Sequence, residues 1–418
     1  MRRALYSLLI FLLLPFAWLR LQWRGRKEPG YTQHIGERFG RYRFKASRPV
    51  IWVHAVSVGE TRAAAPLITA LQTKYPNHQL LVTHMTPTGR ATGESLFGDR
   101  VLRSFLPYDA PFLVRRFLDH FKPELGLIME TEIWPNLIAH CHEKTIPLWL
   151  VNARMSQKSA NKYARFAKLT AESLAKFAGI CAQTTSDAKR LTELGAPHIE
   201  ICGNVKFDVT PPDSMLKLGS DLRERFGAAR PTLLIASTRE GEEELLLDAL
   251  SKISIDKLLV ILVPRHPQRF DEVAALVQKR GLKLQRRSAN EPIDAATHVV
   301  LGDSMGEMFA YYNACDIAFI GGSLVPWGGQ NLIEACAVGK AVLIGPHTFN
   351  FAEASEQAVA CGAARRVANA DALAQEVTML LRDENARRAM SAAGIAFSQA
   401  HRGAVERILK IVTKERNL

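Results

Sequence analysis

Short apolar runs alternate with amphipathic stretches along most of the chain, beginning at Val50. The apolar runs predict buried strands at Val50–Val53, Gln79–Thr83, Val101–Phe105, Leu125–Met129, Pro147–Val151 and Gly179–Ala182. The amphipathic stretches predict helices at Glu60–Tyr75, Pro111–Phe121, Trp134–Glu143 and Ser186–Leu194. Strands and helices that alternate in this way form a parallel sheet covered by helices on both faces. We therefore expect a doubly wound α/β fold in this part of the chain.

A polar segment with two prolines interrupts the alternation at residues 209–220 (VTPPDSMLKLGS), and it predicts a linker. The pattern then resumes, with strands expected at Thr232–Ala236, Leu258–Val263, His298–Leu301, Asp316–Ile320 and Ala341–Ile344. A chain of 418 residues is long enough for two such domains. We expect Rossmann-like domains at residues 28–208 and 221–418 that face a cleft. The last amphipathic stretch, residues 383–414, would cap the second domain or cross back to the first.

An uninterrupted apolar segment, Leu8–Leu19 (LLIFLLLPFAWL), lies near the N-terminus between basic residues. Residues 1–45 contain ten Lys or Arg and two Glu, so they carry +8 of the formal net charge of +13. An apolar segment with basic flanks favours anionic membrane lipids as partners. We therefore predict a membrane anchor at residues 1–27, which would span the bilayer or lie in one leaflet.

A cleaved signal peptide is the alternative for this segment, but no small-x-small cleavage site follows it. The larger basic excess after the segment predicts that the following domain lies on the cytoplasmic face of the membrane. The six cysteines form no C-x-x-C pair, which fits reduced thiols in the cytosol. No zinc-finger or RNP-type signature accompanies the positive charge, so we expect no nucleic-acid partner.

Carboxylates follow two of the predicted strands in the first half of the chain. Ligands of doubly wound sheets bind beyond the carboxyl ends of the strands. Glu60, in HAVSVGET, is either a base that takes a proton from an attacking hydroxyl or a residue that complements the helix dipole. Glu130 and Glu132, in METEIWPN, follow the fourth strand; either they serve the reaction, or Glu130 or Thr131 caps the helix at Pro135.

A glycine-rich loop in the second half, within FIGGSLVPWGGQNLIEA, follows another apolar strand. Such a loop can direct unpaired backbone N–H groups and a helix start at an anion, usually a phosphate. Asn331 and Glu334 would open the helix, and the Glu334 carboxylate could accept hydrogen bonds from a ribose. The alternative is a tight turn that binds no ligand.

Further polar residues lie at other strand ends of both halves: Lys206 in GNVKFD, Arg265 in VPRHP, and Gly306 and Glu307 in GDSMGE. Lys206 could neutralise a phosphate or a substrate carboxylate, or it could be a surface lysine. Arg265, held between prolines, favours recognition of an anion or a base. Together these loops favour group transfer from an activated donor. The sequence contains no Asp-x-Asp pair, which argues against a metal-chelated nucleoside diphosphate, and no P-loop or G-x-S-x-G.

In combination, these segments resemble the Kdo transferases, which add 3-deoxy-D-manno-oct-2-ulosonic acid (Kdo) to lipid A precursors. The resemblance runs through WVHAVSVGE, METEIWPN, NARMS, GNVKFD, VPRHP, GDSMGE, FIGGSLVPWGGQNLIEA and GPHTFNF, and so covers essentially the whole chain. It implies a GT-B type architecture and inverting transfer in lipopolysaccharide biosynthesis. It also implies CMP-Kdo as the donor, a lipid A precursor as the acceptor, and neither a metal nor another cofactor.

By this resemblance Glu60 would be the general base, and Glu130 and Lys206 would stabilise the transition state or hold the donor. The residues that would bind CMP are Pro264, Arg265, Met305, Gly306, Glu307, Asn331, Leu332, Ile333 and Glu334. One position departs from the family, in which GGHNPLE is common, because Gln330 replaces a histidine and cannot become cationic. The alternatives are another GT-B enzyme, such as a sugar-nucleotide epimerase, and a membrane-tethered scaffold without activity.

Overall fold

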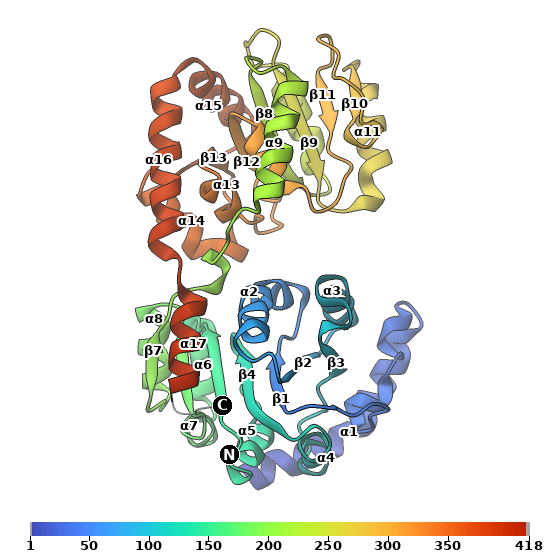
Figure 1. The fold of residues 1–418 in the computed structure, drawn as a ribbon, viewed down its shortest axis with the longest axis vertical. Helices are drawn as coiled ribbons and strands as arrows, with labels where there is room; N and C mark the ends of the chain where they lie inside the picture. The colour runs from blue at the N-terminus through green and yellow to red at the C-terminus, as the bar shows by residue number, and fades with distance from the viewer. Residues whose placement is uncertain (1, 415–418) are drawn as a thin grey trace. The chain divides into compact units, whose positions relative to one another are not determined.

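The computed structural model describes residues 2–414, which fold into two compact units (Figure 1). Unit 1 comprises Met1–Asp208 and Arg402–Leu418, and unit 2 comprises Val209–His401. Residue 1 and residues 415–418, which belong to the predicted anchor and the predicted second domain, lie outside the described residues. Each unit is built on one parallel sheet, so the prediction of two Rossmann-like α/β units is confirmed.

Unit 1 contains a seven-stranded parallel sheet in the order β3-β2-β1-β4-β5-β6-β7. Its strands are β1 (Val50–His54), β2 (Gln79–His84), β3 (Leu102–Phe105), β4 (Pro123–Met129), β5 (Leu148–Ala153), β6 (Gly179–Ala182) and β7 (Ile199–Ile201). Its helices are α1 (Arg3–Gly25), α2 (Val58–Lys74), α3 (Pro87–Phe97), α4 (Pro111–Phe121), α5 (Pro135–Glu143), α6 (Gln157–Ala164), α7 (Ala167–Leu174), α8 (Thr185–Glu193) and α17 (Ala404–Lys414). The chain order reverses between the neighbouring strands β1 and β4, the point where ligands of such sheets bind.

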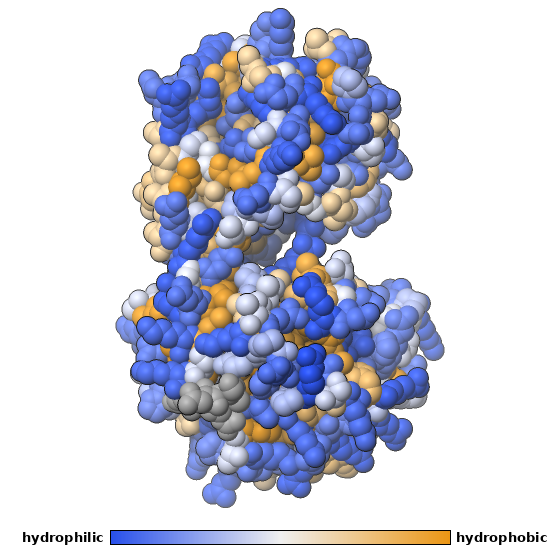
Figure 2. Space-filling model, in the orientation of Figure 1, coloured by the Kyte–Doolittle hydropathy of each residue, from blue (hydrophilic) through white to orange (hydrophobic). Residues whose placement is uncertain are grey.

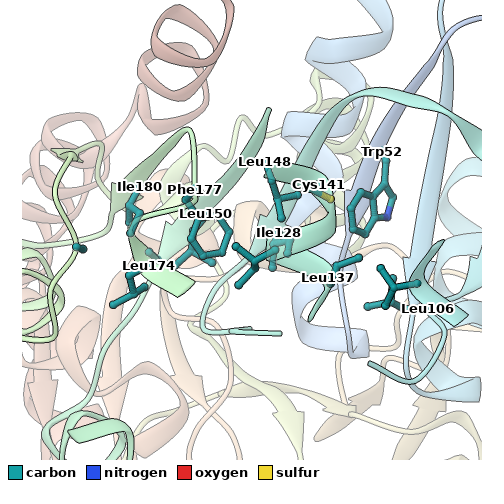
Figure 3. Close-up of a cluster of buried hydrophobic side chains, with 14 of the residues drawn as sticks. Trp52, Leu106, Ile128, Leu137, Cys141, Leu148, Leu150, Leu174, Phe177 and Ile180 are labelled. Atoms are coloured by element: carbon teal, nitrogen blue, oxygen red, sulfur yellow. The ribbon is translucent and has the colours of Figure 1, made fainter. Parts of the chain in front are cut away.

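The apolar sequence of β1 is explained by burial on both faces of this sheet. Trp52 packs in one hydrophobic cluster with Ile128 and Leu150 (Figure 3), whereas Ile51 and Val53 belong to the cluster on the other face. Successive strand residues point to opposite faces, so a strand covered on both sides needs a continuous apolar run.

Unit 2 also has a seven-stranded parallel sheet, in the order β10-β11-β9-β8-β12-β13-β14. Its strands are β8 (Thr232–Thr238), β9 (Leu259–Pro264), β10 (Leu284–Arg286), β11 (Val299–Leu301), β12 (Ile317–Ile320), β13 (Ala341–Ile344) and β14 (Ala364–Arg366). Its helices are α9 (Asp213–Phe226), α10 (Glu242–Leu250), α11 (Phe270–Lys279), α12 (Met308–Ala314), α13 (Ile333–Ala337), α14 (Ala352–Ala360), α15 (Ala370–Arg382) and α16 (Glu384–His401). Here the chain order reverses between β8 and β12.

The prediction of a linker at residues 209–220 is wrong for most of that segment, because α9 begins at Asp213. Pro212 immediately precedes the helix, where proline costs no hydrogen bond since the first N–H groups have no partner within the helix. Leu222 and Phe226 are buried, so α9 is part of unit 2.

The last amphipathic stretch divides at Gly403, whose φ is +89°. The α16 helix before it belongs to unit 2, whereas α17 packs on unit 1 through Ala404 and Ile408. The Asp208 carboxylate accepts hydrogen bonds from the backbone N–H groups of Gly403 and Val405 at the start of α17. The chain therefore crosses back to unit 1, and the assignment of all of residues 221–418 to the second domain is wrong at its C-terminal end.

The predicted strands missed β7, β10 and β14, each of which has three residues and lies at an edge of its sheet. Their sequences, IEI, LQR and ARR, mix polar and apolar residues. These three strands are not enclosed on every side, and they lack the apolar run by which the other strands were recognised.

Within the described residues, α1 is the one helix long and apolar enough to cross a membrane. It includes the predicted apolar segment, and its Leu12 and Phe16 side chains are 56% and 67% exposed. Elsewhere, the face drawn in Figure 2 is mostly hydrophilic, with its hydrophobic residues in small patches.

Candidate active site and nucleotide-binding residues

Glu60 lies in the first turn of α2, directly beyond the carboxyl end of β1. Ser57 is the N-cap residue, and its hydroxyl accepts a hydrogen bond from the Glu60 N–H (3.4 Å) and donates one to Glu60 Oε1 (2.9 Å). Glu60 Oε2 accepts a hydrogen bond from the Val56 N–H (2.8 Å). The S-x-x-E spacing of Ser57 and Glu60 is that of a capping box, which is a local sequence signal for the start of a helix. The carboxylate is therefore held in one position over the turn.

The electrostatic surroundings of Glu60 suit a base near neutral pH. Burial is the main reason that the pKa of Glu60 rises to about 7, and the charge of Glu130 adds to the rise. The Val56 N–H, the Ser57 hydroxyl and Lys206 oppose this shift, because each favours the charged carboxylate. A carboxylate with a pKa near the working pH can accept a proton during a reaction and release it afterwards.

Glu130 is the first residue after β4, the strand beside β1. Its φ is +59°, a left-handed conformation that costs a side-chain-bearing residue about 1 kcal/mol or more. Its backbone N–H donates to the Val151 carbonyl oxygen, which fixes the turn (3.0 Å). Such local strain at a strand end is typical of a functional position.

Lys206 comes from the short 3-10 helix Val205–Phe207 and faces Glu130, with 3.4 Å between Nζ and Oε1. Two hydrogen bonds hold this segment, from the Lys206 N–H to Asn204 Oδ1 (3.0 Å) and from the Val205 N–H to Asn152 Oδ1 (3.1 Å). The side chains of Lys206 and Glu130 are each 24% exposed, so a ligand can reach both. The three residues expected to serve the reaction are thus gathered in unit 1.

Glu132, to which the family resemblance assigned no role, belongs to the same group. Burial raises the pKa of Glu132 to about 7, and the charges of Glu60 and Glu130 act in the same direction. The raised pKa values of Glu60 and Glu132 therefore favour retention of a proton by this pair near neutral pH.

The alternative that Glu130 or Thr131 caps α5 is wrong. The capping carboxylate belongs to Asp109, which accepts hydrogen bonds from the Asn136 N–H (2.9 Å) and the Leu137 N–H (2.8 Å). Asp109 is distant in sequence from α5, so no local pattern could identify it. Glu130 and Glu132 remain available for another role.

In unit 2, Pro264 ends β9 and Arg265 follows it. The Arg265 N–H donates to the Thr238 carbonyl oxygen (3.0 Å), and Arg265 Nε donates to Gln330 Oε1 (3.2 Å). The structure therefore brings Arg265 together with the position at which this chain departs from the family pattern. Gln330 accepts a hydrogen bond there, which a cationic histidine could not do.

Met305, Gly306 and Glu307 form the turn before α12, in which Gly306 has a φ of +83°. The Met305 side chain is 58% exposed. Glu307 Oε2 accepts a hydrogen bond from the Ser304 hydroxyl (2.6 Å), and Glu307 Oε1 accepts one from Arg287 Nη2 (3.3 Å). The Glu307 carboxylate is thus held by its own unit, whereas Met305 is accessible to a ligand.

The α13 helix begins at Ile333, two residues later than expected. Asn331 Oδ1 accepts a hydrogen bond from the Ile333 N–H (3.0 Å), and Asn331 Nδ2 donates to Glu334 Oε1 (3.1 Å). The Leu332 and Ile333 side chains are buried. The polar side chains of this segment therefore orient one another, and its apolar side chains pack in the core.

Of the two alternatives for the glycine loop, a phosphate site or a tight turn, the hydrogen bonds after β12 favour the tight turn. The N–H groups of Gly322, Ser323 and Leu324 donate to the carboxylate of Glu242, at distances of 2.5, 3.0 and 3.0 Å respectively. Glu242 is fully buried at the start of α10. An internal carboxylate occupies the place that the glycine pattern had suggested for an anion.

Positive charge at this edge of unit 2 comes from arginine side chains instead. The Arg239 guanidinium lies 4.4 Å from the centre of the Trp327 ring, and Arg239 Nη1 is 2.7 Å from His266 Nε2. Burial lowers the pKa of His266, and Arg239, Arg265 and Arg269 lower it further. Arg239 was not among the predicted site residues. Among residues 2–414, no group of three or more His, Cys, Asp or Glu side chains is arranged to hold a metal ion.

The chain matches two family models. Residues 33–209 match the model described as 3-deoxy-D-manno-octulosonic-acid transferase (kdotransferase), and residues 244–397 match glycosyl transferases group 1. The 3-deoxy-D-manno-octulosonic acid transferase of Bordetella pertussis is 43% identical over 98% of both chains. The Haemophilus influenzae enzyme of the same name is 38% identical over 100% of both chains.

Among solved structures, the UDP-GlcNAc 2-epimerase of Neisseria meningitidis bound to UDP-GlcNAc has a TM-score of 0.58. It covers 88% of this chain and 100% of its own, at 16% sequence identity. At that identity the similarity establishes the fold alone.

Proposed function

Because the chain belongs to the 3-deoxy-D-manno-octulosonic acid (Kdo) transferase family, we propose that it moves Kdo from CMP-Kdo onto a lipid A precursor with inversion at the anomeric carbon. Its glycosyltransferase activity belongs to lipopolysaccharide biosynthesis. The observation that carries the finer proposal is the Glu60, Glu130 and Lys206 group at the carboxyl edge of the unit 1 sheet.

In the proposed reaction Glu60 acts as the general base. An acceptor hydroxyl oxygen attacks the anomeric carbon of Kdo, the bond from that carbon to the CMP oxygen breaks, and the hydroxyl proton passes to Glu60. The pKa of Glu60, about 7, allows it to be unprotonated before the attack and to hold the proton after it. Its hydrogen bonds from Val56 and Ser57 keep the carboxylate in place between turnovers.

Glu130 and Lys206 would act as a pair. The Glu130 carboxylate orients the ammonium group of Lys206, which is 3.4 Å away, and Lys206 then stabilises negative charge that develops as CMP departs. Its ligand would be the phosphate of CMP or the carboxylate of Kdo, both of which are anions that an ammonium group binds.

For the nucleotide, we propose that Pro264, Arg265, Met305, Gly306, Glu307 and residues 331–334 bind CMP, with Arg239 as an additional cation. Since the Leu332 and Ile333 side chains are buried, these two residues would contribute backbone groups. Asn331 and Glu334, which orient each other, would contact the ribose. We propose that these arginines, rather than a metal ion, balance the single phosphate of the donor.

The exposed apolar face of α1 supports a membrane-attached enzyme. We propose that α1 attaches the protein to the inner membrane, with anionic lipids as partners and both units on the cytoplasmic side. This arrangement would give the enzyme access to an acceptor that is itself a membrane lipid.

The direct test is incubation of the purified full-length protein with CMP-Kdo and a lipid A precursor. We expect a product heavier by one or more Kdo units by mass spectrometry, with an anomeric configuration opposite to that of the donor by NMR. Retention of the donor configuration would contradict the inverting mechanism, and no product would contradict the choice of substrates.

Two control measurements address the alternatives. Calorimetric titration should show that CMP binds and that UDP binds more weakly; preferential binding of UDP would favour a diphosphate-sugar enzyme of the same fold. Transfer in the presence of EDTA should be unchanged, and loss of transfer would contradict the proposal that no metal takes part.

A further inference from the structure

The α1 helix has two distinct faces along its whole length. The positions turned toward the rest of unit 1 are half-buried or buried and recur every three or four residues: Arg3, Tyr6, Ser7, Ile10, Leu14, Ala17, Leu21 and Gly25. The opposite stripe is exposed and apolar: Leu5, Leu8, Leu9, Leu12, Phe16, Leu19 and Trp23. One continuous protein-facing stripe means that the helix lies along unit 1 rather than projecting from it.

Contacts hold α1 to unit 1 near its N-terminal end. Arg3 Nη1 donates to Glu143 Oε1 (2.9 Å), and the Ser7 hydroxyl donates to Asn136 Oδ1 (2.9 Å). Both partners lie on α5, and Figure 1 draws α5 beside the first turns of α1.

Further contacts hold the middle and the C-terminal end of the helix. The Phe11 ring meets the Phe112 ring of α4 edge to face, with 6.3 Å between centroids. Leu21 is 5% exposed, and the Arg24 guanidinium lies 4.2 Å from the centre of the Tyr31 ring. Both ends of α1 therefore touch the same unit.

The length of α1 makes these contacts incompatible with a membrane crossing. A helix of 23 residues is about 35 Å long, and the hydrocarbon core of a bilayer is about 30 Å thick. If α1 crossed the bilayer, one of its ends would be separated from unit 1 by that thickness. We propose that α1 is a monotopic anchor, which lies in the plane of one leaflet with its exposed apolar stripe among the acyl chains.

The surroundings of α1 fit a helix that lies in the plane of the membrane surface. Phe112, which is 41% exposed, extends the apolar surface onto α4, and the Arg116 guanidinium lies 5.7 Å from its ring centre. Arg20 and Arg24 are exposed on α1 itself. Cations at the rim of an apolar stripe bind anionic headgroups while the stripe is inserted.

This inference rests on the proposed membrane attachment and not on the proposed reaction. It can be tested with spin labels on the full-length protein in phosphatidylethanolamine and phosphatidylglycerol vesicles, in a Cys361→Ser background, since the other five cysteines are buried. Labels replace Leu5, Leu12 and Leu19, which share the exposed stripe at seven-residue intervals. Collisions with oxygen and with a water-soluble nickel complex then report the depth of each label, with Glu193→Cys on α8 as the aqueous reference.

We expect the labels at positions 5, 12 and 19 to lie at one shallow depth. In a helix that crosses the membrane, the outer two labels would be about 21 Å apart along the bilayer normal, and label 12 would be the deepest. That depth profile would overturn the monotopic arrangement while leaving the anchor intact. If all three labels were in water, both the monotopic arrangement and the membrane attachment of α1 would be wrong.

Labels on the protein-facing side provide a matched control. Labels at Ile10 and Ala17 should be immobilised and shielded from oxygen if α1 packs on unit 1. A crossing helix would expose them to lipid and leave them mobile, which would contradict the inference. Transferase activity is measured in the same vesicles, so a failure of the proposed reaction is registered separately.

A second measurement does not depend on depth. Ala4→Cys and Lys27→Cys variants, at exposed positions on either side of the apolar segment, are treated with a membrane-impermeant maleimide in sealed vesicles. We expect both cysteines to be labelled from the same side of the membrane. Labelling from opposite sides would show that α1 crosses the bilayer and would overturn the inference.

Discussion

Glu60 in unit 1 and Glu242 in unit 2 occupy comparable places but have different surroundings. Each lies in the first turn of the helix that follows the first strand of its unit, beside the point where the strand order reverses. Glu60 is half-buried and accepts a hydrogen bond from one backbone N–H group and one hydroxyl. Glu242 is fully buried and accepts hydrogen bonds from the N–H groups of Gly322, Ser323 and Leu324. The comparison indicates that the half-buried Glu60 carboxylate stays accessible to a ligand, whereas the fully buried Glu242 carboxylate holds a loop.

The sharpest test of the comparison is Glu60→Gln, for which we expect a loss of about 10²- to 10⁴-fold in kcat, the usual contribution of a general base. The amide keeps the size of the side chain, so the melting temperature should change little. Kdo transfer to the lipid A precursor is the measurement, and Glu193→Gln on α8, an exposed position, is the matched control. Unchanged transfer by Glu60→Gln would contradict the assignment of Glu60 as the general base.

Glu242→Gln should instead reduce the stability of unit 2. One carboxylate oxygen is replaced by an NH₂ group that cannot accept the buried N–H groups, so we expect unit 2 to be destabilised by about 2–3 kcal/mol. Hydrogen exchange of the loop after β12 measures the loss, because the amides of Gly322, Ser323 and Leu324 should lose protection. The control is Glu240→Gln, at an exposed position nearby. Full protection in the Glu242 variant would contradict a structural role.

The pH dependence of transfer tests how the protonation of Glu60 depends on a neighbouring carboxylate. Glu60 must be unprotonated to accept a proton, and its pKa is raised to about 7, so kcat/KM should rise with pH and level off above about 7. In Glu130→Gln the neighbouring negative charge that helps to raise the pKa of Glu60 is lost, so the acid limb of this profile should move to lower pH. A shift to higher pH, or no acid limb at all, would contradict the coupling of the two carboxyl groups.

The smallest effect is expected at Asp208, whose carboxylate caps α17 in unit 1. Asp208→Asn keeps an acceptor oxygen but loses the charge that complements the helix start, so we expect a loss of about 1 kcal/mol. Hydrogen exchange in α17 measures this loss, and protection of the unit 2 sheet serves as the internal reference. A decrease confined to unit 2 would contradict the assignment of α17 to unit 1.

Hydrophobic periodicity alone determined most of the architecture. The central strands of both sheets are buried on two faces, so continuous apolar runs identified them, and the turns after these runs located Glu60, Glu130 and Arg265 at the carboxyl edges. The edge strands β7, β10 and β14 were missed because they lack an apolar run, and the helix α9 was missed because a proline-rich segment precedes it.

The tertiary structure decided which polar groups form hydrogen bonds with one another. The glycine loop after β12 binds Glu242, which lies 80 residues or more before it, and α5 is capped by Asp109 from a separate loop. It also decided that α17 packs on unit 1 and that both ends of α1 contact unit 1. Periodicity is a local property of the chain, whereas the partner of a buried donor or acceptor is selected by the packing of distant segments. The sequence could therefore indicate where polar groups would gather, but not which groups would form hydrogen bonds with one another.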